Sequence, residues 1–417
     1  MTGVLSWWNR RQFLKGTGLF SSSSLLGNIL FAASDGPIGS QANGARKNIY
    51  ERLGVQPLIN AVGPTSMLGG GLMPREVIEA MEEATHHYVS ILELQEAVGK
   101  RIAAIVGAEA AIVTAGASAA LTLGTAACVT GADPDRIKRL PDTAGMKNEV
   151  IIQKAHRFDY DHAIRSAGVK LIEIETSAQL ENAINEKTAM MFYLSRSVQS
   201  GKVPQKEFVE IAKKAGIPTL IDAASDLPPA ERLYEFQRLG FDLVAFSGGK
   251  ALRGPQCSGV LFGRRDLVNA ALLNGFPHPD TIGRTCKVGK EEIVGFLTAL
   301  ELYLKRDHKA EWQEWEERTR FLAQALSDLK GVRTEMMTPD FENALPRGLI
   351  VRWDEKVIPL KHGDVAKMLK EGNPRIEVRP LSAGRPILVI AVYMLRTGEH
   401  KTVANRVREI LKKASLA

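Results

Sequence analysis

The sequence predicts an α/β protein whose larger part is built on a mostly parallel β-sheet and whose smaller C-terminal part is α+β. The chain has 417 residues, of which 45% are hydrophobic and 24% are charged, so it can bury a sizeable core. Short apolar runs alternate with helical patterns from residue 110 to 262. Strands separated by helices form crossover units, which place parallel strands side by side and cover both faces of the sheet.

Residues 1–42 have the layout of an export signal. Arg10 and Arg11 are followed by Phe-Leu-Lys and by an apolar, serine-rich stretch, which resembles the twin-arginine leader of proteins exported in the folded state. An ordinary basic signal peptide is the alternative. Cleavage after Ala32 or after Ala42 fits the sequence, and retention as an anchor stays open, although the stretch is shorter than the ~20 apolar residues of a spanning helix. We therefore expect a periplasmic or otherwise exported protein that meets the twin-arginine machinery.

A short arm at 43–75 is expected to precede a large domain at 76–300. Residues 110–132 contain no charged side chain. The pattern predicts a buried strand at 111–115, a turn at Gly116 and the start of a helix at 117–121. Because a helix N-terminus exposes free N–H groups, this arrangement is typical of a phosphate-binding site.

The remaining elements follow in alternation. Further strands are predicted at 150–153, 169–172, 190–193, 218–221, 242–245 and 259–262, with helices at 161–167, 178–185 and 205–215. Long helices are predicted from Lys290 to Leu329. The small domain, at 301–417, is expected to hold strands at 348–353 and 387–392 and a closing amphipathic helix at 400–413.

The charge pattern excludes some partners. Lys and Arg number 54 and Asp and Glu number 47, a net charge of +7. This excess is spread thinly and does not form the basic block that tracks a nucleic-acid backbone, so we expect no nucleic-acid partner. A small anionic substrate fits such a balance. Three cysteines are too few for a disulfide scaffold.

Residues that directly follow the predicted strands form one candidate site, because ligands of such sheets bind at the carboxyl ends of the strands. These positions hold the phosphate turn at 116–119, His156, Asp222 and the segment from Ser247 to Lys250. They offer a dipole for a phosphate, a flat ring for stacking, a buried acid for a ring nitrogen and an amine. Together they are the parts that hold pyridoxal 5'-phosphate.

At these positions the chain resembles a known family. The segment from Phe246 to Gly259 is similar to the Schiff-base lysine segment of enzymes related to bacterial selenocysteine synthase (L-seryl-tRNA selenium transferase). The likeness covers about residues 50–300, and the branch that includes D-glucosaminate-6-phosphate ammonia lyase is the most similar. It extends to the segments 60–63, 140–149, 156–162, 221–224 and 282–292.

The resemblance implies the type I pyridoxal phosphate-dependent transferase fold, with a seven-stranded large-domain sheet and a small C-terminal domain. It also implies pyridoxal phosphate as the cofactor. Active sites of this fold lie between subunits, so a homodimer or a higher homo-oligomer is implied as well.

The resemblance and the local patterns assign roles to individual residues. Lys250 is expected to bind the coenzyme covalently and then to act as the base at Cα, Asp222 to pair with the pyridine nitrogen, and His156 to stack on the ring. Backbone N–H groups and hydroxyls are expected to hold the phosphate, and basic side chains to bind the substrate's anionic groups. The phosphate residues are Ala117, Ser118, Ala119 and Ser247; the basic candidates are Arg284 and Lys287, then Arg253 and Arg379.

The sequence departs from the family's pattern at three places, so the resemblance supports the cofactor and the fold better than it supports the substrate. The acidic residue that usually precedes the lysine is Gly249, and one basic residue of the family's Arg-x-x-Arg anion site is Lys287. A leader and a short arm take the place of the tRNA-binding domain. Because an exported protein does not meet aminoacyl-tRNA, we reject that substrate.

Other interpretations of the same residues remain. Asp222 fits a helix cap, His156 fits an ordinary structural histidine, and each basic candidate fits a solvated surface charge. A metal site from His156, Asp159, Asp161 and His162 is disfavoured by their spacing, and we expect no metal. Ser247-x-x-Lys250 matches a motif of penicillin-binding proteins, but the motifs that accompany it are missing. Cys257 is expected to be a small buried residue that fills space.

The favoured function is a pyridoxal phosphate-dependent enzyme, a lyase or transferase, that acts on an amino acid or amino sugar acid, most simply by α,β-elimination. Aminotransferase, racemase and aldolase chemistry share the first step and stay open. The alternative of another class is a binding module that keeps the fold without catalysis.

Overall fold

The computed structural model describes residues 48–197, 200–337, 348–380 and 387–415. The predicted export signal at 1–42 lies outside the described residues. The chain divides into two compact units, Met1–Val55 and Gln56–Ala417. In the first unit, helix α1 (Ile49–Arg52) begins with a capping box, in which Asn48 and Glu51 each accept a hydrogen bond from the other's backbone N–H.

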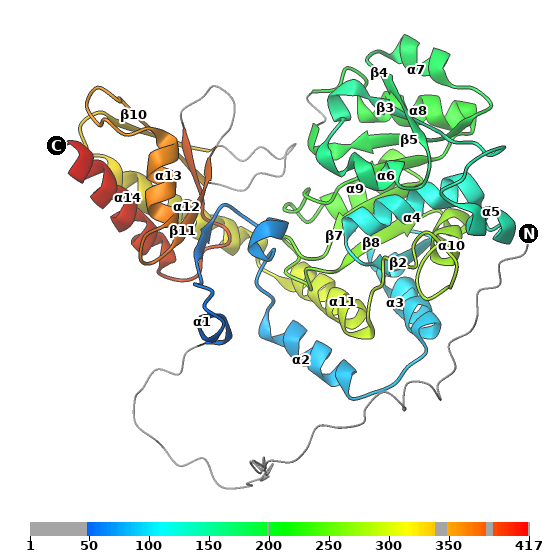
Figure 1. Cartoon of the computed structure of the whole chain (residues 1–417), viewed down its shortest axis with the longest axis horizontal. Coiled ribbons are helices and arrows are strands. Elements are labelled where there is room, and N and C mark those ends of the chain that lie inside the picture. The colour runs from blue at the N-terminus through cyan, green and yellow to red at the C-terminus, as the bar shows by residue number, and fades with distance from the viewer. Residues whose placement is uncertain (1–47, 198–199, 338–347, 381–386, 416–417) are drawn as a thin grey trace, which may run out of the picture. The chain divides into compact units, whose positions relative to one another are not determined.

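The larger part of the second unit alternates strands and helices as the sequence predicts (Figure 1). Its strands are β2 (Ala110–Thr114), β3 (Glu149–Gln153), β4 (Lys170–Ile174), β5 (Thr188–Leu194), β6 (Thr219–Asp222), β7 (Leu243–Ser247) and β8 (Gly259–Gly263). Its helices are α2 (Arg75–Thr85), α3 (Ile91–Val106), α4 (Ala117–Thr130), α5 (Pro134–Arg139), α6 (His162–Arg165), α7 (Ser177–Ala183), α8 (Gln205–Ala215), α9 (Arg232–Leu239), α10 (Arg265–Leu273) and α11 (Lys290–Lys305). Short 3-10 turns lie at Ser66–Leu68, Lys154–His156, Asp159–Asp161 and Ser195–Ser197.

These strands form one seven-stranded sheet in the order β2-β8-β7-β6-β5-β3-β4, which confirms the predicted α/β class. All neighbouring pairs are parallel except those of β8, which runs antiparallel to both β2 and β7. The connection from β7 to β8 contains no helix. Without a crossover helix the chain returns in the opposite direction, so β8 is antiparallel.

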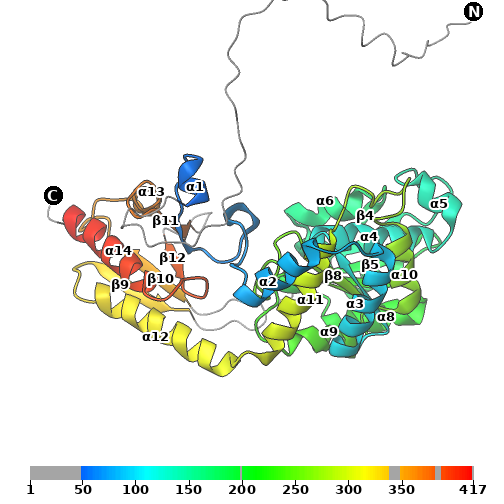
Figure 2. The same ribbon diagram turned by 90° about the horizontal axis from the view of Figure 1, so that it is seen from below.

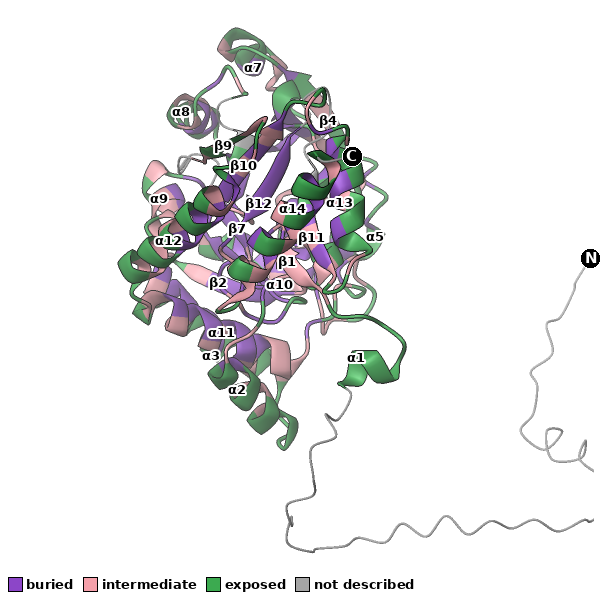
Figure 3. Cartoon of the chain, turned by 90° about the vertical axis from the view of Figure 1, so that its left-hand side faces the viewer, coloured by how far each residue is buried: buried purple, intermediate pink, exposed green. Residues whose placement is uncertain are grey.

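Each central strand contributes to a core on both faces of the sheet. In β5, Met191 and Tyr193 belong to one buried cluster, and Met190 and Phe192 belong to the other. Helices α3, α8, α9 and α11 cover the first face, and α4, α6 and α10 cover the second. Four of the five residues of β7 are buried, and Figure 3 shows exposed residues in green on the outer sides of helices such as α2 and α14. Burial on two sides explains why these strands are continuous apolar runs.

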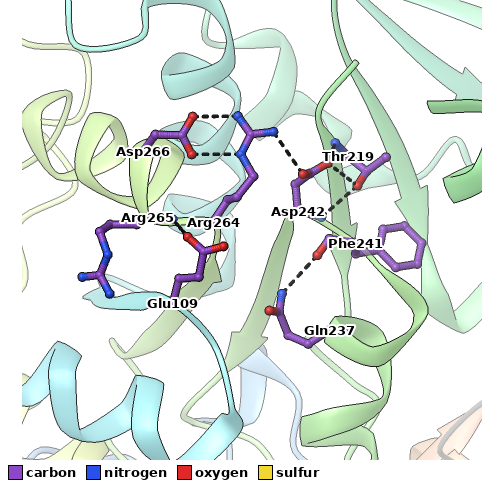
Figure 4. Close-up of polar contacts among 8 residues, drawn as sticks. All are labelled: Glu109, Thr219, Gln237, Phe241, Asp242, Arg264, Arg265 and Asp266. Carbon is purple, nitrogen blue, oxygen red and sulfur yellow. Dashed lines mark hydrogen bonds and ion pairs between the residues drawn. The ribbon is translucent and has the colours of Figure 1, made fainter. Parts of the chain in front are cut away.

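A polar network fixes the amino ends of β6 and β7 (Figure 4). Asp242 accepts hydrogen bonds from the N–H of Thr219 at 2.8 Å, from its hydroxyl at 2.9 Å and from Arg264 at 3.1 Å. Arg264 also makes a two-pronged contact with Asp266 at the start of α10. The network therefore lies at the edge opposite the predicted ligand site.

The remaining strands form a second, five-stranded sheet in the order β1-β11-β12-β10-β9 (Figure 2). Its elements are β1 (Ile59–Ala61), β9 (Val332–Met336), β10 (Gly348–Trp353), β11 (Ile376–Pro380) and β12 (Leu388–Ala391), with α12 (His308–Leu326), α13 (His362–Lys370) and α14 (Glu399–Ser415). Strand β1 is parallel to β11, and the other pairs are antiparallel. A strand from the predicted arm thus belongs to the small sheet, while the predicted domain boundaries stay predictions.

Over the ranges that the structure describes, no helix has the length and apolar content needed to cross a membrane.

Candidate active site

A cavity of about 310 Å³ opens at the carboxyl ends of β2, β5, β6 and β7. This is the edge at which a mostly parallel sheet binds its ligands. Lys250, Asp222, Ser247, Ala117 and Ser118 all line it. Segments that lie more than 130 residues apart in the sequence therefore contribute to one site, as the strand pattern predicts.

Lys250 is placed by crowded glycines. A Cβ atom on Gly248 would lie 2.1 Å from the Ser258 hydroxyl, and one on Gly249 would lie 2.6 Å from the Cα of Gln256. The loop before the lysine is also fixed by the N–H of Gly71, which donates to the carbonyl of Gly249 at 2.8 Å. The departure from the family at position 249 thus has a local reason, since no side chain fits there.

The Lys250 amine donates a hydrogen bond to the Ser225 hydroxyl at 2.6 Å. Burial lowers the pKa of this lysine, and the charge of Asp222 acts in the opposite direction. A lowered pKa increases the fraction of neutral amine, which is the form that attacks an aldehyde or takes a proton.

Asp222 ends β6 and is 8% exposed. One carboxylate oxygen accepts the N–H of Ala224 at 2.8 Å. Burial raises the pKa of Asp222, against the effects of that hydrogen bond and of the Lys250 and Arg196 charges. A protonated ring nitrogen would supply the cation that this buried carboxylate needs.

The turn between β2 and α4 fits a phosphate group. Gly116 has φ of 93°, a conformation that favours glycine, and no side chain caps the helix that follows. The free N–H groups of the first turn therefore face the cavity at Ala117 and Ser118. Ala119 is 5% exposed and is not among the lining residues, so it supports the turn from within α4.

His156 is fully buried and is not among the residues that line the cavity. Its ring meets the ring of Tyr193 edge-on at 4.4 Å between centroids, and its Nδ1 accepts the N–H of Leu194 at 3.4 Å. Among the described residues, the aromatic side chains that line the cavity are Phe158 and Tyr160. Stacking of His156 on a cofactor stays a prediction.

The basic residues predicted for substrate binding do not line this cavity. Arg284 and Lys287 are exposed and lie over the ring of Phe276, at 5.2 Å and 5.7 Å from its centroid. Arg253 donates to the carbonyl of Tyr393 at 3.5 Å. Arg379, on β11, is exposed. The cavity's arginine is Arg196, which follows β5 and lies 5.5 Å from the ring centroid of Phe158.

Several residues of the cavity were missed from the sequence, and one was misjudged. Arg196, Ser225 and Asp226 lie in turns after β5 and β6, where the apolar pattern has already ended. The expectation that Cys257 fills buried space is wrong: Cys257 is exposed and lines the cavity, because it and Gln256 form the exposed tip of a loop whose flanking residues, Pro255 and Ser258, are buried.

The alternative metal site does not form around Asp161. Its carboxylate accepts hydrogen bonds from Arg157 at 2.5 Å and from Arg165 at 3.0 Å. Burial raises the pKa of this carboxyl group, but the two guanidinium groups outweigh it and the pKa lies below its usual range. Within the described residues, no three His, Cys, Asp or Glu side chains are grouped to hold a metal ion.

Comparison with known proteins identifies the family. The profile of SelA, L-seryl-tRNA selenium transferase, matches residues 58–331. The chain belongs to the SelA family. This SelA family member is 31% identical over 379 residues to D-glucosaminate-6-phosphate ammonia lyase of Salmonella typhimurium, across 88% of the chain and 99% of the relative.

A solved structure of D-glucosaminate-6-phosphate ammonia lyase superposes on the SelA family member with a TM-score of 0.77 at 30% identity, across 88% and 99% of the two chains. The SelA family member is also 30% identical to the 5'-C-glycyluridine monooxygenase-decarboxylase of a Streptomyces species, across 90% of the chain and 95% of the relative.

The fold extends to more distant enzymes. The structure of SPT with its PLP internal aldimine matches with a TM-score of 0.56 at 16% identity, across 86% of this chain and 89% of that one. The predicted type I fold is thereby confirmed. SelA family enzymes are lyases and transferases that use pyridoxal phosphate, so membership implies that cofactor.

Proposed function

We propose that this protein is a pyridoxal phosphate-dependent enzyme that removes a β-substituent from an amino acid or amino sugar acid and releases a 2-oxo acid and ammonia. The observation that carries the proposal is the placement of the Lys250 amine and the Asp222 carboxylate in one cavity, beside the free N-terminus of α4. The 31% identity to an ammonia lyase over 99% of its length supports the reaction class.

The residues of the cavity fit the cofactor group by group. Lys250 would hold its aldehyde carbon, Asp222 its ring nitrogen, and Ala117, Ser118 and Ser247 its phosphate. When bound, pyridoxal phosphate supplies an electron-accepting ring that stabilises negative charge at the substrate's Cα. Asp222 is too buried to be stable as an unpaired anion, which supports a cationic partner at that place.

We assign removal of the proton from the substrate's Cα to Lys250. Burial keeps its pKa below that of a free lysine, so a larger fraction of the amine is neutral than in an exposed lysine and can take the proton from the substrate's Cα. The hydrogen bond to Ser225 at 2.6 Å orients the amine within the cavity. The charge of Arg196, at the cavity wall, is suited to the substrate's carboxylate.

One observation favours a second candidate. The 30% identity to a monooxygenase-decarboxylase, over 95% of its length, supports oxidative loss of the α-carboxylate. Such a reaction consumes dioxygen and releases carbon dioxide, whereas elimination does neither. Aminotransferase, racemase and aldolase reactions remain alternatives within the same fold.

The test starts from purified protein supplied with pyridoxal phosphate. We expect a visible absorbance band that Lys250→Ala removes, and release of ammonia and a 2-oxo acid from a panel of β-hydroxy amino acids and 2-amino-2-deoxy sugar acids with and without phosphate. Dioxygen uptake with carbon dioxide release would favour the second candidate. A bound cofactor with no bond changed in any substrate would overturn both and favour a binding module.

We also propose a homo-oligomer, at least a dimer, and export by the twin-arginine route. The first rests on the fold, whose active sites lie between subunits, and sedimentation of the holoenzyme tests it. The second rests on Arg10 and Arg11 in the leader. A cofactor made inside the cell has to be installed before the folded protein crosses the membrane, which suits that route.

A further inference from the structure

A second buried carboxyl group lines the cavity beside Asp222. Asp226 is 2% exposed. Neither of its carboxylate oxygens has a hydrogen-bond partner among the residues that the structure describes. An unpaired carboxylate at such a place is costly when charged, so the group is expected to carry a proton or to meet a ligand.

Asp226 lies on the same turn as the residues that serve Lys250. The turn follows β6 and places Asp222 and Asp226 at the cavity with Ser225, the hydrogen-bond partner of the lysine, between them. The N–H of Asp226 donates to the carbonyl of Ala223 at 3.1 Å, which fixes the backbone of this turn. The turn therefore places the carboxyl group of Asp226 one residue after Ser225, the hydrogen-bond partner of the Lys250 amine.

Several groups set the protonation of Asp226. Burial raises its pKa to about 7, and the charge of Asp222 acts in the same direction. The nearby Ser195 hydroxyl, which makes no regular hydrogen bond to the carboxyl group, and the positive charges of Arg232 and Lys250 act in the opposite direction. A carboxyl group that titrates near neutrality is suited to give a proton and to regain it from water.

We propose that Asp226 is the general acid that protonates the leaving β-hydroxyl group of the substrate. This inference rests on the proposed elimination. Lys250 takes the proton from Cα, the bond from Cβ to oxygen breaks with its electron pair on oxygen, and that oxygen takes the proton of Asp226 and leaves as water. Asp226 regains a proton from solvent. Hydrolysis of the remaining enamine gives the 2-oxo acid and ammonia.

With Asp226 as the acid, Lys250 does not have to transfer both protons. After it has taken the Cα proton, the amine is a cation held by Ser225 at 2.6 Å. A second proton donor at the cavity wall allows the β-oxygen to be protonated without moving the lysine. Asp222 does not supply that proton, because its carboxylate is assigned to the ring nitrogen.

The experiment compares Asp226→Asn with a matched control, Glu231→Gln, which changes an exposed carboxylate of the same loop that does not line the cavity. Two substrates are used with the holoenzyme: a β-hydroxy amino acid that the wild type accepts, and its β-chloro analogue, whose chloride leaves without a proton. Exchange of the Cα proton in heavy water is measured for each variant. The infrared carbonyl band of a protonated carboxyl group is recorded as a readout independent of turnover.

We expect Asp226→Asn to lose about 100-fold in elimination of the hydroxyl group, to keep elimination of chloride and Cα-proton exchange, and to lose the infrared band. Glu231→Gln is expected to match the wild type in both eliminations, in Cα-proton exchange and in the infrared band. Undiminished elimination of the hydroxyl group by Asp226→Asn would overturn this inference alone, as would equal losses with both substrates and in exchange. A wild-type holoenzyme that eliminates neither group would overturn the proposed function as well.

Discussion

At the scale of single residues, the hydrogen bond from Lys250 to Ser225 orients the amine within the cavity. We expect Ser225→Ala to lower kcat about 10-fold, because the amine loses the hydrogen bond that orients it. Steady-state kinetics and the cofactor absorbance check this. Ser327→Ala, at an exposed serine in the small domain, serves as the control. A kcat equal to that of the wild type would show that the contact is dispensable.

Asp226 makes stability depend on pH in a direction unusual for an acid. Its folded pKa of about 7 lies above the unfolded value of about 3.9, so the folded state binds more protons in between. The contribution of Asp226 to the free energy of unfolding is therefore fully present below pH 4. It falls by on the order of 4 kcal/mol as the pH rises to 7.

Chemical denaturation of the cofactor-free protein between pH 5 and 8 measures this effect. Because Asp226→Asn cannot titrate, the stability difference between wild type and variant is expected to shift in favour of the variant as pH rises. Parallel curves for the two proteins would contradict the raised pKa.

Site residues could be predicted from the sequence where they directly follow a recognisable strand. Lys250 follows β7 through two glycines and Asp222 ends an apolar strand, so both were predicted and both line the cavity. Ser225, Asp226 and Arg196 carry no such signal, since they lie in turns whose path depends on the folded sheet. The four basic residues chosen for the substrate lie elsewhere, because chain position alone does not show which way a long side chain points.

At the scale of elements, the phosphate turn depends on a glycine of another strand. A Cβ atom on Gly259 of β8 would lie 2.5 Å from the carbonyl carbon of Gly116 and 2.7 Å from the nitrogen of Ala117. We expect Gly259→Ala to lower the free energy of unfolding by about 1–3 kcal/mol and to weaken cofactor binding.

Denaturation curves and cofactor titration test this expectation. The matched control is Gly363→Ala on α13, where an added Cβ meets no atom within 4 Å. If the two variants behave alike, the close approach of β8 to the turn is not important for stability.

The polar network at the amino ends of β6 and β7 makes a separate prediction. Asp242→Ala removes the acceptor of the buried Thr219 N–H and of Arg264, so we expect a loss of about 1.5–3 kcal/mol in stability. Activity at a temperature where the variant stays folded is expected to be unchanged, because the network lies at the amino ends of β6 and β7, whereas Asp222 and Ser247 line the cavity at their carboxyl ends. A selective loss of activity would contradict this separation.

Strands of the large sheet were predicted to within about two residues at each end, because they are buried on both faces and read as apolar runs. Strands β1, β9 and β11 were not predicted. β9 alternates half-buried and exposed residues, and β1 is only three residues long. Short strands at or near a sheet edge carry little hydrophobic signal, so their pairing is decided by tertiary contacts.

At the scale of the whole molecule, the export prediction rests on the leader alone. We expect replacement of Arg10 and Arg11 by lysine to retain the protein in the cytoplasm in a folded state that still contains cofactor. Cell fractionation with absorbance of the purified cytoplasmic protein measures both. Unchanged export would identify the leader as an ordinary signal peptide.

The overall class was predictable because the alternation of strands and helices is a property of long stretches of sequence. The antiparallel strand β8 and the contribution of β1 to the small sheet were not, since both depend on how distant segments meet.

The pairing of β1 with β11 has a consequence for how the protein is made. Ile376 follows Ile59 by 317 residues, so the first strand of the small sheet leaves the ribosome long before its partner. At ~5–20 residues per second, roughly 15–60 s pass during translation between the two. The small domain is therefore completed only near the end of synthesis. In any chain that ends before β11, strand β1 lacks the partner with which it forms backbone hydrogen bonds.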